Sequence, residues 1–443
     1  MMALNWKNIL KTKKCFKSID RKAAFIMSLF LSLSLFTGCS ASKTAKSFYD
    51  VIDRIVSHFG VSDNDASSTE LSSDEALSVD DWLKEHPEEY DTDGNGSAEQ
   101  SASENTDVSI EEMKYYAYST LTQNEQKIYK QIYSCLANMR ENVVVSTKDT
   151  DMIDKCFNYC IMDHPEIFFV NGYSTKITKI ANMITEIRVS GRYTMSPSMV
   201  ESKRAQINDL VKEILADAPQ DDSDYEKAKY VFEYIVNNTT YNLDAEDNQN
   251  ICSVFLNKES VCQGYSMAVK YLLDRLDVPC AVVYGEVNDT PHAWNLVKLD
   301  GTYCYIDSTW GDQSFKSAEK DDIENGINYN YFGCNDDILN ATHELSSPAK
   351  LPECTSLDKY YYVMEGLFFR SADTERLKAV FNNQISNEAD FFTIRCETAE
   401  VYDELKRLLL DDRLILSMMP YATKVTYAMS EVEHTMTFWL KTS

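Results

Sequence analysis

The segment centred on Asp300-Gly301 constrains the fold of this chain most, because it predicts two strands joined by a two-residue turn. Counting outward from the turn pairs Trp294 with Asp307. In that register His292 and Asp307 lie on one face of the sheet as diagonal neighbours, about 7–8 Å apart at the backbone. A slip of one residue would place them on opposite faces. The register therefore predicts a hydrogen bond between an imidazole and a carboxylate.

A helix is predicted to begin at Cys262. Apolar side chains recur at helical spacing between Tyr265 and Leu276, and Val278-Pro279 ends the pattern. A helix N-terminus offers unpaired backbone N–H groups and the positive end of the helix dipole. A thiolate and a tetrahedral oxyanion are both stabilised there, and Gly264 lets the backbone approach closely.

Cys262, His292 and Asp307 together suit attack on an amide carbonyl, which requires a thiolate, a base and a carboxylate that orients the base. Taken singly, each residue has a structural interpretation. Cys262 could be a packed hydrophobic residue, His292 a core residue beside Trp294, and Asp307 the cap of a turn. Their joint occurrence at a helix start and on two paired strands favours a catalytic triad.

The segments VCQGYS at 261–266, PHAWNL at 291–296 and YIDSTW at 305–310 resemble the motifs of the transglutaminase-like superfamily, relatives of papain-type thiol enzymes. That family has a cysteine in G-x-C-x-G-[YF]-[AS], a histidine in H-[AS]-W-N and an aspartate in [VIL]-D-x-T. Ser260 replaces the usual glycine before the cysteine, and the similarity covers about 206–345. The matching residues are Cys262, Gly264, Tyr265, Ser266, His292, Trp294, Asn295, Asp307, Thr309 and Trp310.

The resemblance implies an α+β fold with a papain-like transglutaminase core, in which the helix of the nucleophile packs on an antiparallel sheet. It also implies that Gly264, Tyr265 and Trp294 line the site. Tyr241 resembles a tyrosine common upstream of the cysteine in bacterial members, where it either lines the site or packs. The segment DHPEIFFVNGY at 163–173 resembles the leader domain of bacterial members that carry a lipobox.

The resemblance further implies an acyl-enzyme on Cys262. Resolution by water would make a cysteine peptidase or amidase, which we favour because the sequence shows no water-excluding tunnel. Resolution by an amine would make a transglutaminase, and a non-catalytic surface binding module on the same fold is a third alternative. Peptide or protein substrates are expected as partners, including cell-wall or surface proteins.

No cofactor or metal is indicated by the sequence. Cys156 and Cys160 are four residues apart, but no second pair completes a zinc site. The 43 basic and 70 acidic residues give a net charge of −27. Such a chain would repel phosphate, so a nucleic-acid partner is excluded.

The N-terminus has the pattern of a targeting segment. Basic residues precede an apolar run, Ala23 to Phe36, that is too short to span a bilayer. Leu35 to Cys39 resembles a bacterial lipobox, so Cys39 is expected to carry lipid. An ordinary cleaved signal peptide is the alternative. A lipid on Cys39 would hold the chain at the extracytoplasmic face of the cell membrane.

Composition and periodicity predict the remaining organisation. A signal segment (1–38) and a membrane-proximal segment (39–60) precede an acidic, disordered linker (61–110) whose one basic residue is Lys84. A mostly helical subdomain with a short sheet (111–205) and the catalytic core (206–347) follow. A small α/β domain (350–443) is expected last, with strands at 358–369, 391–396, 423–429 and 434–441.

Overall fold

The computed structural model describes residues 114–180, 183–312, 326–346, 351–419 and 425–440. The expected signal segment, Cys39, the membrane-proximal segment and the acidic linker lie outside these residues. Within the described ranges, no helix combines the length and the apolar character that crossing a bilayer requires.

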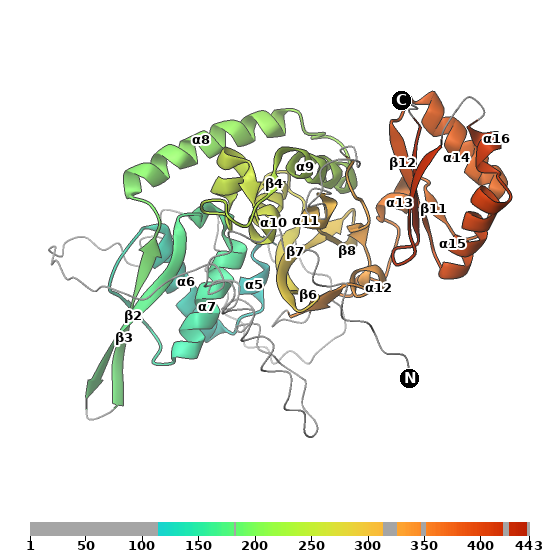
Figure 1. Cartoon of the computed structure of the whole chain (residues 1–443). Helices are drawn as coiled ribbons and strands as arrows, with labels where there is room; N and C mark the ends of the chain where they lie inside the picture. The colour runs from blue at the N-terminus through green and yellow to red at the C-terminus, as the bar shows by residue number, and fades with distance from the viewer. Residues whose placement is uncertain (1–113, 181–182, 313–325, 347–350, 420–424, 441–443) are drawn as a thin grey trace, which may run out of the picture. The chain divides into compact units, whose positions relative to one another are not determined.

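The N-terminal subdomain packs helices against a three-stranded antiparallel sheet of order β1-β3-β2. Thr122 and Glu125 form a capping box that begins α6. The short sheet expected within residues 111–205 is larger than predicted, because β2 and β3 form a long hairpin (Figure 1). The elements are α5 (Tyr116–Ser119), α6 (Gln123–Ala137), β1 (Val143–Val145), α7 (Thr150–Asp163), η2 (Pro165–Ile167), β2 (Val170–Ile180), β3 (Met183–Tyr193) and α8 (Pro197–Ala216).

The region expected to form the catalytic core contains a five-stranded antiparallel sheet of order β10-β6-β7-β8-β9, and α10 packs on β6 and β7. Helix α8 runs through residues 205 and 206, where the sequence had suggested a boundary. The core elements are α9 (Asp224–Asn238), β4 (Thr240–Tyr241), η3 (Ser253–Asn257), β5 (Glu259–Ser260), α10 (Cys262–Leu273), β6 (Cys280–Val287), β7 (Thr290–Leu299), β8 (Thr302–Ile306), α11 (Ser308–Gly311), β9 (Phe332–Cys334), α12 (Asp336–Leu339) and β10 (His343–Leu345).

Alternate residues of the central strand β7 enter two different hydrophobic clusters. Ala293 and Val297 belong to the cluster that contains α10. Trp294 and Leu296 belong to a second cluster, which also contains side chains of the C-terminal domain. The sheet is therefore buried on both faces, which explains why the consecutive residues Ala293 and Trp294 are both apolar.

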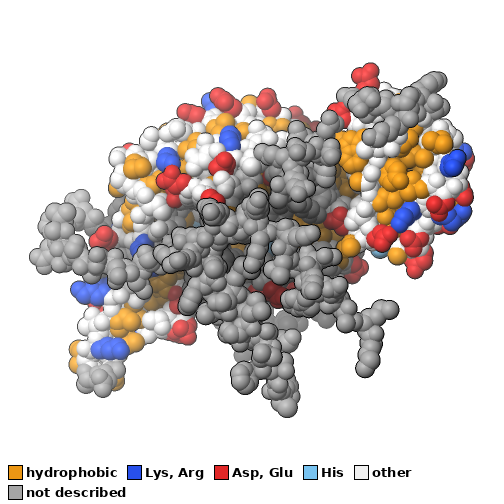
Figure 2. Space-filling model, viewed as in Figure 1, with side chains coloured by type: hydrophobic (Ala, Val, Ile, Leu, Met, Phe, Trp, Pro, Cys, Tyr) orange, Lys and Arg blue, Asp and Glu red, His pale blue; other side chains and the backbone are white. Residues whose placement is uncertain are grey.

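The C-terminal domain has a four-stranded sheet of order β11-β12-β14-β13. The prediction of a strand at 358–369 is wrong over most of this segment. Its aromatic run forms a helical turn, and only its end is a strand. Leu416 and Val432 are exposed, and Figure 2 shows hydrophobic side chains gathered on the viewed face of this domain. The elements are α13 (Tyr361–Met364), β11 (Phe368–Phe369), α14 (Thr374–Ser386), β12 (Phe391–Cys396), α15 (Ala399–Lys406), η5 (Arg407–Asp411), α16 (Ile415–Met418), β13 (Thr426–Ser430) and β14 (Thr435–Trp439).

Candidate active site

Cys262 is the first residue of α10, as the sequence predicted. The preceding residue, Val261, is extended and gives no side-chain cap. Cys262 is 8% exposed, whereas every other described cysteine is at most 1% exposed. All ten described cysteines are free thiols. Cys262 is thus the most accessible described thiol and faces the positive end of a helix dipole.

The hairpin that carries His292 has the predicted register. Leu299 pairs with Thr302, and Asp300 and Gly301 both have positive φ, as a tight two-residue turn requires. His292 Nε2 lies 2.7 Å from Asp307 Oδ2. The structure therefore brings these two side chains together as the register predicted.

Asp307 itself lies just beyond the strand on which the sequence had placed it. Strand β8 ends at Ile306, and Asp307 is the N-cap of the short helix α11. Its Oδ1 accepts a hydrogen bond of 3.1 Å from the backbone N–H of Trp310, which leaves Oδ2 for His292. The carboxylate is thus held by the backbone on one side and orients the imidazole with the other.

A second histidine, His343 on β10, contacts the same carboxylate oxygen and was missed from the sequence. Its Nε2 lies 3.0 Å from Asp307 Oδ2, and its Nδ1 lies 2.8 Å from Thr342 Oγ1. Thr342 Oγ1 is also 2.8 Å from the hydroxyl of Tyr331. His343 has a fully buried side chain. A buried chain of hydrogen bonds therefore holds the same Asp307 oxygen that faces His292.

Motif residues beside the triad fix α10 against β7. The side-chain amide of Asn295 donates a 3.0 Å hydrogen bond to the carbonyl oxygen of Ser266. The hydroxyl of Ser266 donates in turn to the carbonyl oxygen of Cys262, at 2.8 Å. Two residues of the sequence motifs thus couple the strand of the base to the first turn of the nucleophile's helix.

Electrostatics favour an imidazolium at His292. Burial opposes the charged ring, but the charge and hydrogen bond of Asp307, together with neighbouring Cys262, raise the pKa of His292 well above its ordinary value. Burial likewise opposes the carboxylate, yet His292 and His343 hold the pKa of Asp307 well below its usual range. The site is therefore built to keep a positive charge beside the thiol and a negative charge behind the imidazole.

This arrangement predicts an unusual pH dependence. In an acyl transfer through this site the imidazolium would protonate the leaving amine, so activity should fall on the alkaline side only when His292 loses its proton. We expect the alkaline limb of kcat/KM to lie at least one unit above the ordinary histidine pKa of about 6.5. Asp307→Asn should move that limb to lower pH, because it removes the carboxylate that raises the pKa. An alkaline limb at the same pH in both proteins would contradict the electrostatic assignment.

Tyr241 lies near the nucleophile, whereas the other three residues expected to line the site pack against neighbouring groups. Burial, followed by the charges of Cys262 and Asp307, raises the pKa of Tyr241. Its hydroxyl therefore stays protonated and can donate. The hydroxyl of Tyr265 instead bonds to Thr239 O and Asp312 Oδ2, in the interior.

Gly264 and Trp294 shape the site from behind. A Cβ on Gly264 would lie 1.9 Å from Ser260 Oγ, so glycine permits close packing against Ser260 there. Trp294 is buried, and its ring stacks on that of His292 with centroids 5.8 Å apart. The rings of Trp294 and His343 also meet edge to face, with centroids 5.1 Å apart. Trp294 is therefore a buried packing partner of both histidines.

His292, Asp307 and His343 form the one group of potential metal ligands found among the described residues. Ligand atoms of His292, Asp307 and His343 lie within 4.8 Å of one another. Both imidazole nitrogens that face Asp307 already have the carboxylate as their hydrogen-bond partner. The hydrogen bonds thus account for the arrangement of these three side chains.

Comparisons with known proteins place this region in a family. Residues 209–308 match the model of the Transglutaminase-like superfamily. The chain is 25% identical over 158 residues to Kyphoscoliosis peptidase of Mus musculus, a match that covers 32% of this chain and 23% of the mouse protein. Residues 209–308 therefore form a transglutaminase-like domain, and the chain as a whole spans only a minor part of that relative's length.

Two solved structures are also similar to this chain. One, described as a TGase, shares 18% identity, covers 34% of this chain and 48% of its own, and has a TM-score of 0.23. The other, described as a candidate cysteine protease from Cytophaga hutchinsonii, shares 13% identity, covers 31% of this chain and 61% of its own, and has a TM-score of 0.22.

Proposed function

We propose that this chain is a thiol hydrolase, a cysteine peptidase or amidase that attacks peptide or side-chain amides through Cys262. The observation that carries the proposal is the 2.7 Å hydrogen bond between His292 and Asp307 beside a thiol at a helix N-terminus. A thiol, an imidazole and a carboxylate in this order suit acyl transfer. Asp307 would orient the imidazole and stabilise its charge.

The reaction would proceed in two steps. The thiolate of Cys262 attacks the amide carbonyl carbon, the C–N bond breaks, and the leaving amine takes a proton from His292, which leaves a thioester. Water then attacks the thioester while His292 takes a proton from it, and the carbon–sulfur bond breaks to give a carboxylic acid and the free enzyme. Backbone N–H groups at the start of α10, with the hydroxyl of Tyr241 as a further candidate donor, would stabilise both oxyanions.

Water is the proposed acceptor because Cys262 keeps part of its surface exposed. An acyl group on the thiol would therefore be reachable from solvent. An amine acceptor would make the same acyl-enzyme a transglutaminase, so the two activities differ only in the second step. They can be distinguished in one assay.

The assay offers the purified full chain a glutamine-containing peptide, with and without an added primary amine. Hydrolysis predicts release of ammonia or a new peptide terminus, with no incorporation of the amine into the product. Efficient incorporation would instead establish amine transfer. No turnover of any amide, together with full cellular function of a Cys262→Ala protein, would overturn the enzymatic proposal in favour of a binding module.

We also propose that the protein is a lipoprotein anchored through Cys39 at the extracytoplasmic face of the cell membrane. The basic segment, the short apolar run and the lipobox-like sequence support this proposal. Mass spectrometry of the mature N-terminus shows directly whether the chain begins at Cys39 and whether Cys39 carries lipid. A Cys39 without lipid, or a mature chain that begins elsewhere, would refute it.

A further inference from the structure

The hairpin formed by β2 and β3 extends beyond the rest of its sheet. Strand β1 pairs only with residues 187–189 of β3, whereas β2 and β3 pair with each other as far as Ile180 and Met183. Past residue 187 the hairpin is therefore a two-stranded ribbon, which no other described strand joins. Figure 1 shows this ribbon reaching past the helices of the N-terminal subdomain. Because two strands alone are at best marginally stable in water, a contact outside the chain would stabilise the ribbon.

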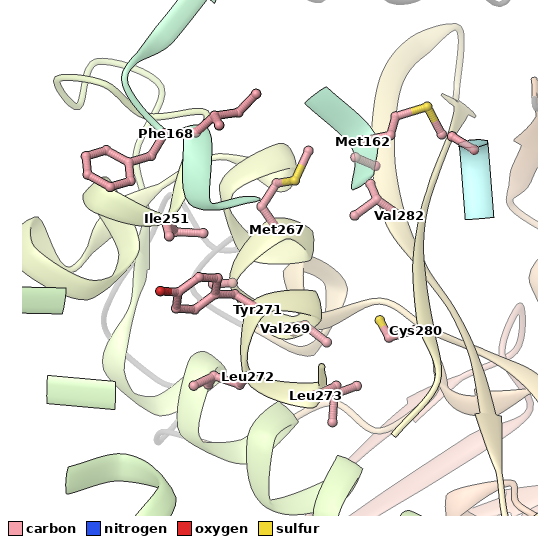
Figure 3. Close-up of a cluster of buried hydrophobic side chains, with 14 of the residues drawn as sticks. Met162, Phe168, Ile251, Met267, Val269, Tyr271, Leu272, Leu273, Cys280 and Val282 are labelled. Atoms are coloured by element: carbon pink, nitrogen blue, oxygen red, sulfur yellow. The ribbon is translucent and has the colours of Figure 1, made fainter. Parts of the chain in front are cut away.

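The ribbon exposes large apolar side chains. Ile180 and Met183, which pair across the two strands, are 65% and 69% exposed, and Ile177 is 39% exposed. Other large apolar side chains of the subdomain, such as Met162 and Phe168, are instead buried in the cluster that contains α10 (Figure 3). Apolar side chains that gather on an exposed surface mark a contact with a protein or a membrane.

Two exposed lysines, Lys176 and Lys179, accompany these side chains on β2. Neither lysine forms an ion pair within the part of the chain that the structure describes. The single acid of the hairpin, Glu186, pairs with Arg188 at 2.7 Å. Figure 2 shows hydrophobic and basic side chains together along the ribbon. The hairpin is thus basic, although the chain as a whole has a net charge of −27.

The exposed residues of the ribbon are here called the ribbon patch, and an anionic lipid surface fits its chemistry. The patch consists of Lys176, Ile177, Lys179, Ile180 and Met183. Apolar side chains of an interfacial element enter the boundary between headgroups and acyl chains, and lysines reach the phosphates with their long stems. Two copies of the patch would place like charges together, which disfavours self-association. A specific protein interface buries about 800 Å² on each partner, more than five side chains on a narrow ribbon offer.

We propose that the ribbon patch inserts its apolar side chains into an anionic phospholipid surface, with its lysines at the headgroup phosphates. This contact goes beyond the proposed anchoring through Cys39, and it is independent of the chemistry at Cys262. Far more residues separate Cys39 from Lys114 than the 11 residues of either hairpin strand. A chain anchored at Cys39 can therefore bring the ribbon patch to the same membrane.

Met183 itself reports the contact. The full chain is treated with dilute hydrogen peroxide, with and without vesicles that contain phosphatidylglycerol, and mass spectrometry follows the oxidation of each methionine to its sulfoxide. Each lysine near an anionic surface raises affinity about fivefold, so the vesicles should slow the oxidation of Met183 at least about fivefold. Met199 and Met364, which are 50% and 42% exposed, are internal controls whose oxidation should keep its rate.

A pair of lysine variants tests the electrostatic part of the contact. Lys176→Gln combined with Lys179→Gln removes about 25-fold in affinity, so the slowing should fall below about twofold. The matched control combines Lys127→Gln on α6 with Lys212→Gln on α8, which are also exposed and should leave the slowing intact. Added salt should weaken the slowing in the wild-type chain, because it screens the lysines from the phosphates.

A variant of the apolar part completes the test. Ile180→Thr keeps a β-branched side chain in the strand but makes it polar, and it should also weaken the slowing. No slowing with any vesicle, equal slowing with pure phosphatidylcholine, or a slowing that Ile180→Thr leaves unchanged would overturn the inference. Slowing without vesicles that increases with protein concentration would assign the patch to a second copy, and would overturn it too. The lipid on Cys39 is measured separately at the mature N-terminus, so its absence would refute the anchor alone.

Discussion

Replacing His292 with alanine is expected to lower kcat/KM by about 10³-fold or more, because removal of one member of a catalytic triad disables the whole unit. The variant loses both the acid that protonates the leaving amine and the positive charge beside the thiol. The same change should abolish the selective alkylation of Cys262 by iodoacetamide. At pH 6 an unassisted thiol, with an ordinary pKa of about 8.5, is almost entirely protonated.

Accessibility alone would also favour alkylation at Cys262, since this thiol is 8% exposed and the other described cysteines are at most 1% exposed. The informative comparison is therefore between the wild-type chain and the variant at the same low pH, by mass spectrometry of each cysteine. His434→Asn is the matched control: it replaces a histidine of the C-terminal domain whose positive φ asparagine tolerates. Equal labelling of all cysteines in the wild-type chain, or labelling of Cys262 unchanged by His292→Ala, would contradict the assigned thiol–imidazole pair.

The parts of the site that could be predicted from sequence are those that local chemistry determines. The Asp300-Gly301 turn sets the register of its own strands, so the pairing of Leu299 with Thr302 and the meeting of His292 with Asp307 followed from counting. Helical periodicity likewise placed the start of α10 correctly. In both cases the relevant residues lie within one hairpin or one helix.

The parts that could not be predicted depend on contacts between distant segments. His343 reaches Asp307 because β10 pairs with β6, more than 50 residues earlier in the chain. The segment around it, ATHELSS, carries no motif, and a single histidine gives no sign of its partner. The aromatic run at Tyr360–Tyr362 was predicted as a strand, yet the hydroxyls of both tyrosines bond to Asn330, and the turn they form is helical. Tertiary hydrogen bonds outweigh strand propensity there.

The second large effect is expected at His343, which we interpret as a residue that positions Asp307. His343→Phe keeps an aromatic ring among Trp294, Trp310 and Tyr331 but removes the N–H that donates to Asp307 Oδ2. A hydrogen bond to a charged group is worth about 1.5–3 kcal/mol, so kcat should fall about 10- to 100-fold with little change in KM.

The pH profile separates positioning from mere packing in this variant. The hydrogen bond from His343 is one cause of the lowered pKa of Asp307, so its loss should move the acid limb of kcat/KM to higher pH. His343→Asn, whose amide N–H can still donate, should restore part of kcat and part of the acid limb. A purely structural role predicts a lower melting temperature with an acid limb at the wild-type pH. That result would leave Asp307 oriented by His292 and the N–H of Trp310 alone.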